Sequence, residues 1–314
     1  MKKIFALILA LSLVFTLAAC GSDSDGETVT QTETETVADI TETVSETEAE
    51  TETATPDSVK EESTTAESKP ATEADVASET DEKEDKLPST KAEILAEYTR
   101  IMNQAKKDKP GFSKVEYQEL PEEGRVVTDG EGAVNAALGV AANFMTDKEK
   151  AEKEPFVAEK GGDMNEFPIR NCPSGCLLTD TDFLKSAKCE ELSNGNRKIT
   201  LVLKSETNPE PVISGTNKTQ SKTGSILSPV SKAEIDETLN GSVVSAVGKD
   251  ITYQLTYHDC VVELTYNPET GRIVQFHQIT RTSIKGSAKV LGVFHLAVEN
   301  TELIDYLTIS KFVY

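Results

Sequence analysis

The chain has 314 residues and a formal net charge of −22, with 54 acidic and 32 basic residues. The charge is uneven, because residues 21–90 hold 22 acidic residues against 4 lysines, whereas residues 91–314 hold 32 acidic and 26 basic residues. The absence of a basic stripe argues against nucleic-acid binding, and a single short apolar run argues against a polytopic membrane protein. The numbers predict a leader, an acidic segment and one globular domain.

Residues 1–19 are predicted to be a secretory signal peptide. Lys2 and Lys3 form a short basic start, and an apolar stretch follows over residues 4–17. This stretch is too short to cross a bilayer comfortably, and a basic start before a short apolar run is typical of an export signal. We therefore expect the mature chain to begin after residue 19.

The end of the leader reads Leu17-Ala18-Ala19-Cys20. Here the chain resembles bacterial lipoprotein precursors, whose lipobox is a leucine, two small residues and a cysteine. The resemblance implies that the Cys20 thiol receives diacylglycerol, that cleavage follows Ala19, and that a lipid anchor holds the protein at the extracytoplasmic face of the cell membrane. Two acyl chains hold a protein on a bilayer far better than one. The alternative is a plain secreted protein with an incidental cysteine.

Residues 20–90 are predicted to be a disordered acidic tether. The segment is rich in Thr, Glu, Ser and Ala and has no Phe or Tyr, so it cannot bury enough apolar surface to offset chain entropy. Like charges keep it extended, and an ideal coil of this length spans on the order of 45 Å. No group of its carboxylates has the spacing of a calcium loop. We expect a spacer between the membrane and the domain.

Residues 91–314 are predicted to form a single α+β domain that begins with two helices. Thr90 and Glu93 form a capping box, apolar residues then recur every three or four positions, and Pro110 marks the end. A second helix is expected over Glu131–Met145, with an alanine-rich apolar stripe. Both stripes are interpreted as core faces.

Short elements follow in the middle of the domain. Strands at 187–192 and 199–204 are joined through Asn194-Gly195, a hairpin signal in which both turn positions are expected to have positive φ. Residues 207–229 are polar and rich in Gly, Pro and Thr, and are expected to form a mobile loop. A helix is expected over 232–240, capped by Ser231 and ended by Gly241.

The last third has the strongest strand pattern. Alternating residues predict strands at 251–258 and 260–266, then 272–282, with further strands at 288–298 and 303–313. Long strands in meander order after two helices predict an α+β fold with two N-terminal helices packed on a curved, mainly antiparallel sheet. A cystatin-like or NTF2-like sheet is the alternative.

Four cysteines remain in the domain once Cys20 is lipidated: Cys172, Cys176, Cys189 and Cys260. An even number in an exported domain indicates two disulfides, expected between Cys172 and Cys176 and between Cys189 and Cys260. Reduced buried thiols are the second interpretation, and a zinc site is the third. The spacing of Cys172 and Cys176 is not that of a thiol oxidoreductase, and no cofactor is expected.

No catalytic set can be assembled from the sequence. His258, His277 and His295 lie in or beside strands, without the spacing of a metal site. His258 and Cys260 share one strand face and resemble a thiolate–imidazole pair only in spacing. Gly241 to Lys249 fails the spacing of a phosphate-binding loop. We therefore expect no metal ion and assign no catalytic residue, and the sequence favours a non-enzymatic domain without deciding the question.

Three functions stay open. The first is a surface-anchored, non-enzymatic binding domain whose partner is a protein, a wall polymer or a lipid. The second is a carrier of an apolar, acyl-type ligand, which requires an uncovered trough formed by Tyr253, Leu255, Tyr257, Leu264 and Tyr266. The third is a cell-wall enzyme with an unrecognised site. The globular part resembles lipoproteins of uncharacterised function from Firmicutes, which implies export but no activity.

Overall fold

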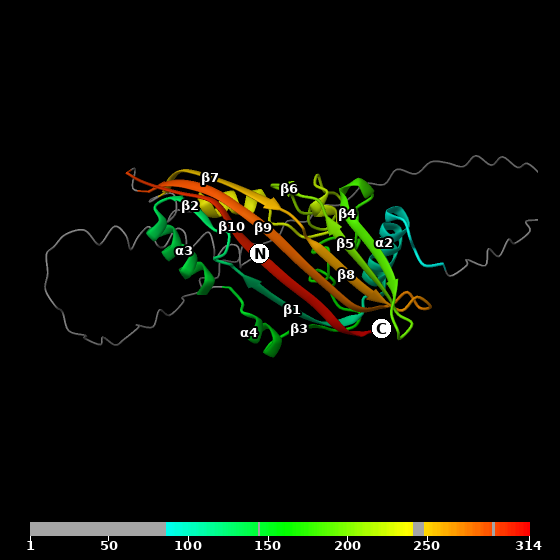
Figure 1. Ribbon diagram of the computed structural model, residues 1–314. Helices are drawn as coiled ribbons and strands as arrows, with labels where there is room; N and C mark the ends of the chain where they lie inside the picture. Colours follow the sequence, from blue (N-terminus) through cyan, green and yellow to red (C-terminus); the bar gives the residue numbers. More distant parts are fainter. Residues whose placement is uncertain (1–85, 144, 241–247, 291–292) are drawn as a thin grey trace, which may run out of the picture. The chain divides into compact units, whose positions relative to one another are not determined.

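The computed structural model describes residues 86–314, apart from residues 144, 241–247 and 291–292 (Figure 1). The predicted signal peptide, the lipidation site at Cys20 and the tether up to residue 85 lie outside the described residues. These parts of the sequence interpretation therefore stay predictions. The expected helix end at Gly241 also lies outside them.

The described elements include two long connections, one between β3 and η2 and one between β6 and η3. In chain order they are α2 (Lys91–Asp108), β1 (Gly111–Glu119), β2 (Val126–Asp129), α3 (Glu131–Asn143), α4 (Lys148–Lys153), β3 (Phe156–Ala158), η2 (Thr181–Phe183), β4 (Leu184–Glu191), β5 (Arg197–Leu203), β6 (Glu206–Thr207), η3 (Thr223–Ser225), α5 (Lys232–Leu239), β7 (Gly248–Tyr257), β8 (Val261–Tyr266), β9 (Ile273–Val290) and β10 (Phe294–Val313).

Helix α2 has the predicted boundaries and the predicted cap. The Thr90 side chain accepts from the backbone N–H of Glu93, and the Glu93 carboxylate accepts in return from the Thr90 N–H at 2.9 Å. The chain leaves the helix at Lys109, which has a left-handed φ of 48°. This reversal satisfies carbonyls of the last turn, and it turns the chain directly into β1.

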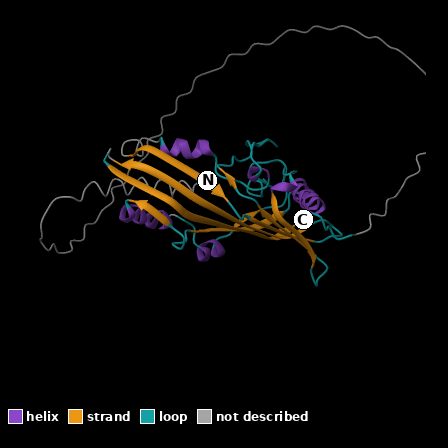
Figure 2. Ribbon diagram, turned by 45° about the horizontal axis from the view of Figure 1, so that its top comes forward, coloured by secondary structure: helices purple, strands orange, loops and turns teal. Residues whose placement is uncertain are grey.

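One antiparallel sheet of ten strands joins the described elements, so the expected α+β class with a mainly antiparallel sheet is confirmed in outline. Its main path runs β3-β1-β10-β9-β8-β5-β4, with β2 paired to β10, β7 paired to β9, and β6 paired to β7. The two longest strands, β9 and β10, run through the whole sheet (Figure 2). They are flanked by β8, β5, β1 and β3 in one half and by β7, β6 and β2 in the other.

The long strands correct the prediction for the C-terminal third. Strands expected at 272–282 and 288–298 are wrong as separate units, because β9 continues to Val290 and the chain reverses before Phe294. The polar residues near Gly286 resemble a turn in the sequence. They stay extended because β9 is hydrogen-bonded on both sides, to β10 and to β7.

The hairpin of β4 and β5 forms as predicted, but with a different turn. Only Gly195 has positive φ there, at 77°. Its N–H donates to the carbonyl of Leu192, and the N–H of Leu192 donates to the carbonyl of Asn196. This is a wider connection in which a single left-handed glycine is sufficient, rather than a two-residue turn with two left-handed positions.

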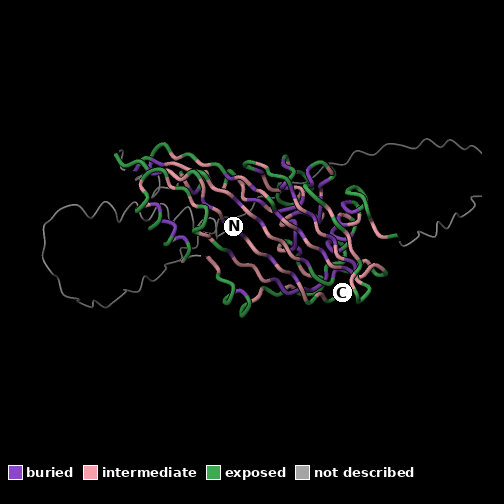
Figure 3. Tube along the Cα trace, viewed as in Figure 1, coloured by how far each residue is buried: buried purple, intermediate pink, exposed green. Residues whose placement is uncertain are grey.

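The apolar core lies on one face of the sheet. The larger cluster joins α2 to β5, β8 and β9, and the smaller one joins α3 to Ala288, Val290 and Leu296. Phe276, Ile284 and Ala288 are all even-numbered residues of β9, so both clusters use the same face of that strand. Along β5 and β8 buried residues alternate with half-buried ones (Figure 3).

Candidate functional site

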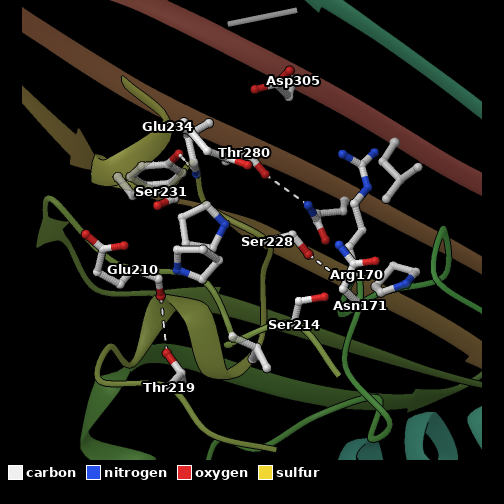
Figure 4. A pocket seen from close by; sticks show the side chains of 18 of the residues that line it. Arg170, Asn171, Glu210, Ser214, Thr219, Ser228, Ser231, Glu234, Thr280 and Asp305 are labelled. Carbon is white, nitrogen blue, oxygen red and sulfur yellow. Dashed lines mark hydrogen bonds between the residues drawn. The ribbon is translucent and has the colours of Figure 1, made fainter. Parts of the chain in front are cut away.

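A polar cleft of about 720 Å³ lies between the core face of the sheet and two loops (Figure 4). One wall is formed by β1, β9, β10 and the end of β7. The other walls come from residues 168–171, from residues 210–220 and from the segment 228–234 that leads into α5. The cleft collects polar side chains that lie far apart in the sequence.

The sheet wall presents two rows of polar residues because of the strand register. Gln118 lies opposite Asp305, which lies opposite Thr280. Two residues further along the strands, Glu116 lies opposite Leu307, which lies opposite Gln278. Since side chains two residues apart share a face, both rows point into the cleft.

Gln118 is a buried polar residue of the cleft. Its side-chain amide donates to the Asp305 carboxylate, and the residue is 8% exposed. Its carbonyl oxygen Oε1 is buried and has no hydrogen-bond partner among the described residues. An unpaired buried acceptor is costly, so this oxygen marks the place where a bound donor would be most favourable.

Arg170 stands on the loop wall within a network of four charges. Its Nη2 lies 2.6 Å from Glu116 Oε2, and its Nε lies 3.7 Å from Glu166 Oε2. Lys114 binds the same two carboxylates. Burial alone would lower the pKa of Arg170, but the carboxylates of Glu116 and Glu166 outweigh burial and raise it. The guanidinium is therefore fixed by the protein's own carboxylates.

The loop that carries Arg170 is held by a buried lysine of α2. Lys106 Nζ donates to the carbonyl oxygens of Met164, Phe167 and Ile169, each at 2.8 Å. Burial lowers the pKa of Lys106 to about 8, so the ammonium still predominates at neutral pH. The backbone N–H of Arg170 donates to Ser228 Oγ at 2.9 Å, which ties this loop to the opposite one.

The second loop wall corrects the expectation of a mobile loop over 207–229. Glu206 accepts from the N–H groups of Lys222 and Thr223 at 3.2 and 2.6 Å, and the Ser221 hydroxyl donates to the carbonyl of Glu210 at 2.7 Å. Thr223 is buried. The polar groups of this segment hydrogen-bond one another, which gives the wall a defined backbone path.

The remaining carboxylates of the cleft are Glu210 and Glu234. Both are half-buried, and neither carboxylate has a hydrogen bond or ion pair with another described residue. They lie across the cleft from Arg170 in Figure 4. Glu234 is in the first turn of α5, where the helix dipole favours a negative charge.

The cysteines are placed as four free thiols. Cys172 is buried with Ile169 and Val212, whereas Cys176 belongs to the core beneath α2. The two side chains therefore enter different clusters, and the predicted Cys172–Cys176 disulfide is not formed. The backbone N–H groups of Gly175 and Cys176 donate to Asn103 Oδ1 at 2.8 Å, which fixes this turn against α2.

The predicted Cys189–Cys260 disulfide is not formed either. Cys189 on β4 lies level with Ile199 on β5 and Leu264 on β8. Cys260 precedes β8, so it lies two strands away from Cys189 and four residues along the sheet from that level. Both thiols contact the core as predicted, but at separate places. Burial raises the pKa of Cys176 and of Cys260 to about 11, which keeps both protonated.

The histidines do not come together. His277 Nδ1 lies 2.9 Å from Thr308 Oγ1, and His295 Nδ1 lies 3.2 Å from Asp129 Oδ2 at the other end of the sheet. His258 is within 3.8 Å of Glu302, while the Cys260 thiol donates to backbone carbonyls. Within the described ranges no three His, Cys, Asp or Glu side chains are grouped as metal ligands.

A second hollow is a narrow apolar groove of about 110 Å³ between α3 and α5. Val134 and Leu138 line one side, and Ile235 and Leu239 line the other. Of the residues expected to form an apolar trough, Tyr253 and Leu255 line this groove. Tyr257, Leu264 and Tyr266 do not line it and are buried in the core.

Sequence reasoning missed the residues of the cleft. Gln118 and Glu116 lie on β1, which was not predicted, and Arg170 and Glu210 lie on loops. Alternation of Val115 and Tyr117 with polar neighbours is a strand signal in that segment. It gives no indication of which face is covered.

Comparison with known proteins found no matching family model, no similar curated protein and no similar solved structure. In the part of the chain that is described, no helix is both long and apolar enough to cross a membrane.

Proposed function

We propose that this protein is a membrane-anchored, extracytoplasmic lipoprotein that displays a non-enzymatic binding domain. Support for the anchor is the lipobox Leu17-Ala18-Ala19-Cys20. Support for binding is the polar cleft, and the observation that carries most weight is the buried, unpartnered Oε1 of Gln118 within it. A concave site with a few convergent polar groups is the usual form of a ligand site.

The scaffold of this proposal is a pair of N-terminal helices packed on a curved antiparallel sheet. Helix α2 supports the loop of Arg170 through Lys106, and α3 contacts the other half of the same sheet face. This arrangement leaves the cleft between sheet and loops open to a ligand while its walls stay fixed. Preformed walls reduce the entropy that binding costs.

The side chains of the cleft suit binding better than catalysis. No histidine or cysteine is among the described residues that line it, so a nucleophile with an adjacent imidazole base is not available there. General-acid catalysis needs a protonated carboxyl. Glu116 instead forms ion pairs with two cations, Lys114 and Arg170.

A carrier of an apolar ligand is the second candidate, and one observation favours it. The groove between α3 and α5 is lined almost entirely by apolar atoms. Its volume of about 110 Å³ is small for an acyl chain, which places this candidate behind the polar cleft.

The anchor is tested by fractionating cells that express the full chain or Cys20→Ala. We expect Cys20→Ala to leave the membrane fraction or to accumulate as an uncleaved precursor, because the thiol is the acyl acceptor. Cys189→Ala, which changes a thiol of the domain, is the matched control and should stay on the membrane. A processed Cys20→Ala protein that remains fully membrane-bound would refute the anchor.

The binding function is tested by native mass spectrometry of the full chain released from membranes in mild detergent. We expect a small molecule to be retained by the wild type and lost in Gln118→Met, which removes the amide but keeps the side-chain length. If no adduct is retained and cell extract adds none, the proposal of a binding domain fails.

A further inference from the structure

The charge of the polar cleft selects the ligand. Among its described lining residues are four carboxylates, those of Glu116, Glu210, Glu234 and Asp305, and one cationic side chain, Arg170. The guanidinium of Arg170 is bound to Glu116 and Glu166. The cleft therefore presents an excess of negative charge and has no free cation with which to bind an anion.

The unpartnered hydrogen-bonding groups of the cleft favour a ligand that donates hydrogen bonds. The Gln118 amide donates one N–H to Asp305, and its Oε1, which has no hydrogen-bond partner among the described residues, can only accept. Glu210 and Glu234 also offer only acceptors. A ligand that satisfies these groups must supply N–H or O–H donors at more than one place.

The two sets of acceptors are on different walls. Gln118 and Asp305 belong to β1 and β10 of the sheet wall, whereas Glu210 and Glu234 belong to the loop segment and to α5. Figure 4 shows Asp305 on the sheet and Glu210 on the loop that faces it. A ligand that bridges the walls needs donors at separate positions along its length.

Apolar side chains line part of the cleft. Pro211, Val212, Pro229 and Leu307 line the cleft together with the polar residues. Methylene groups pack against such side chains, while carboxylates bind ammonium groups by charge-assisted hydrogen bonds. The cleft thus contains surfaces suited to both chemistries that an aliphatic polyamine carries.

We propose that the polar cleft binds an aliphatic di- or polyamine, with one ammonium group between Glu210 and Glu234 and a second N–H donor on Gln118 Oε1. This inference rests on the proposed function of a binding domain and names the ligand class of the same cleft. The half-buried carboxylates hold the ammonium group more strongly than exposed ones would, because water screens them less.

The test is isothermal titration of the full chain in detergent with three probes of different charge. Spermidine carries several ammonium groups, tetraethylene glycol is neutral, and glutarate is a dianion. We expect heat of binding with spermidine alone. Equal or tighter binding of glutarate or tetraethylene glycol would overturn the inference.

Variants locate the site. Glu234→Gln removes one charge from a side chain without a described partner, and we expect it to weaken spermidine binding about tenfold, the loss of one charge-assisted hydrogen bond. Glu237→Gln is the matched control, since Glu237 is exposed on the same helix. Spermidine affinity that is unchanged in both Glu234→Gln and Gln118→Met would overturn the assignment to this cleft.

The two experiments distinguish a wrong ligand class from a wrong binding function. An adduct that is lost in Gln118→Met, together with no affinity for spermidine, leaves a binding domain but refutes the amine ligand. If neither an adduct nor spermidine binding is found, both the ligand class and the binding function are refuted.

Discussion

The contact between Lys106 and the loop at 164–170 gives the sharpest prediction for stability. Lys106 is 5% exposed, and its ammonium donates to three carbonyl oxygens. Lys106→Met keeps the length of the aliphatic chain but removes all three donors. The loop would then lose the contact that connects it to α2.

The expected cost follows from what each carbonyl retains. Met164 O still accepts from the Phe167 N–H at 3.1 Å, and Ile169 O still accepts from the Cys172 N–H at 3.4 Å. In Lys106→Met, the carbonyl oxygen of Phe167 would have no hydrogen-bond donor among the described residues. One orphaned carbonyl and two lost charge-assisted bonds cost about 3 kcal/mol in total, after allowing for the relief of a buried ammonium.

Urea denaturation at pH 7 measures this cost, with circular dichroism as the readout. We expect Lys106→Met to lower the free energy of unfolding by about 3 kcal/mol and the melting temperature by roughly 6–12 °C for a domain of this size. Lys107→Met is the control, because Lys107 is exposed on the same turn of α2, and should change stability by less than about 0.5 kcal/mol. Equal stability of the two variants would refute the role of Lys106.

Three further predictions concern local features. Hydrogen bonds from Thr90 and Ser89 lower the pKa of Glu93 to about 2, so the stability that this carboxylate contributes is present above pH 4.5 and is lost as the pH falls toward 2. Acid melts of Glu93→Gln should lack that part of the pH dependence, and identical acid profiles would contradict the cap. Thermal melts should show that Gly175→Ala destabilises the domain by about 2 kcal/mol or more, because a Cβ there would lie 2.4 Å from Met102 O. In the same assay, Gly139→Ala on the exposed side of α3 should stabilise the domain by about 0.5–1 kcal/mol. In denaturant without reductant, maleimide should label all four domain cysteines, Cys172, Cys176, Cys189 and Cys260. In the native state it should label Cys176 and Cys260 only slowly. A non-reducing peptide map that contains either predicted disulfide would contradict the free thiols.

Local signals in the sequence were sufficient for the elements whose ends are set by neighbouring residues. The capping box at Thr90 correctly predicts the start of α2. Helix α3 begins at the predicted residue and ends at Asn143, two residues before the predicted end at Met145. In these cases the atoms that decide the structure lie within one helical turn of one another. Such contacts are encoded in a short window of sequence.

Features that depend on partners elsewhere in the chain could not be predicted. β9 remains extended past Gly286 only because β7 and β10 pair with it on both sides. Likewise Gln118, Arg170 and Glu234 meet in one cleft although more than 50 residues separate each from the next. Each is an ordinary polar residue in its own segment. Only the strand register and the Lys106 contacts bring them to the same place.

The charge of the sequence and the charge of the cleft have the same sign, and the two act over different ranges. Residues 21–90 carry 22 acidic residues and 4 lysines, which attract cations toward the protein and repel anions. In 0.15 M salt such attraction between exposed charges is screened beyond about 8 Å, whereas half-buried carboxylates such as Glu234 are screened much less. Salt should therefore slow the association of a cationic ligand. It should leave most of the difference in ligand affinity between the wild type and Glu234→Gln. If the cleft binds an amine, as proposed, the acidic segment acts on the rate of encounter and the cleft decides which ligand stays bound.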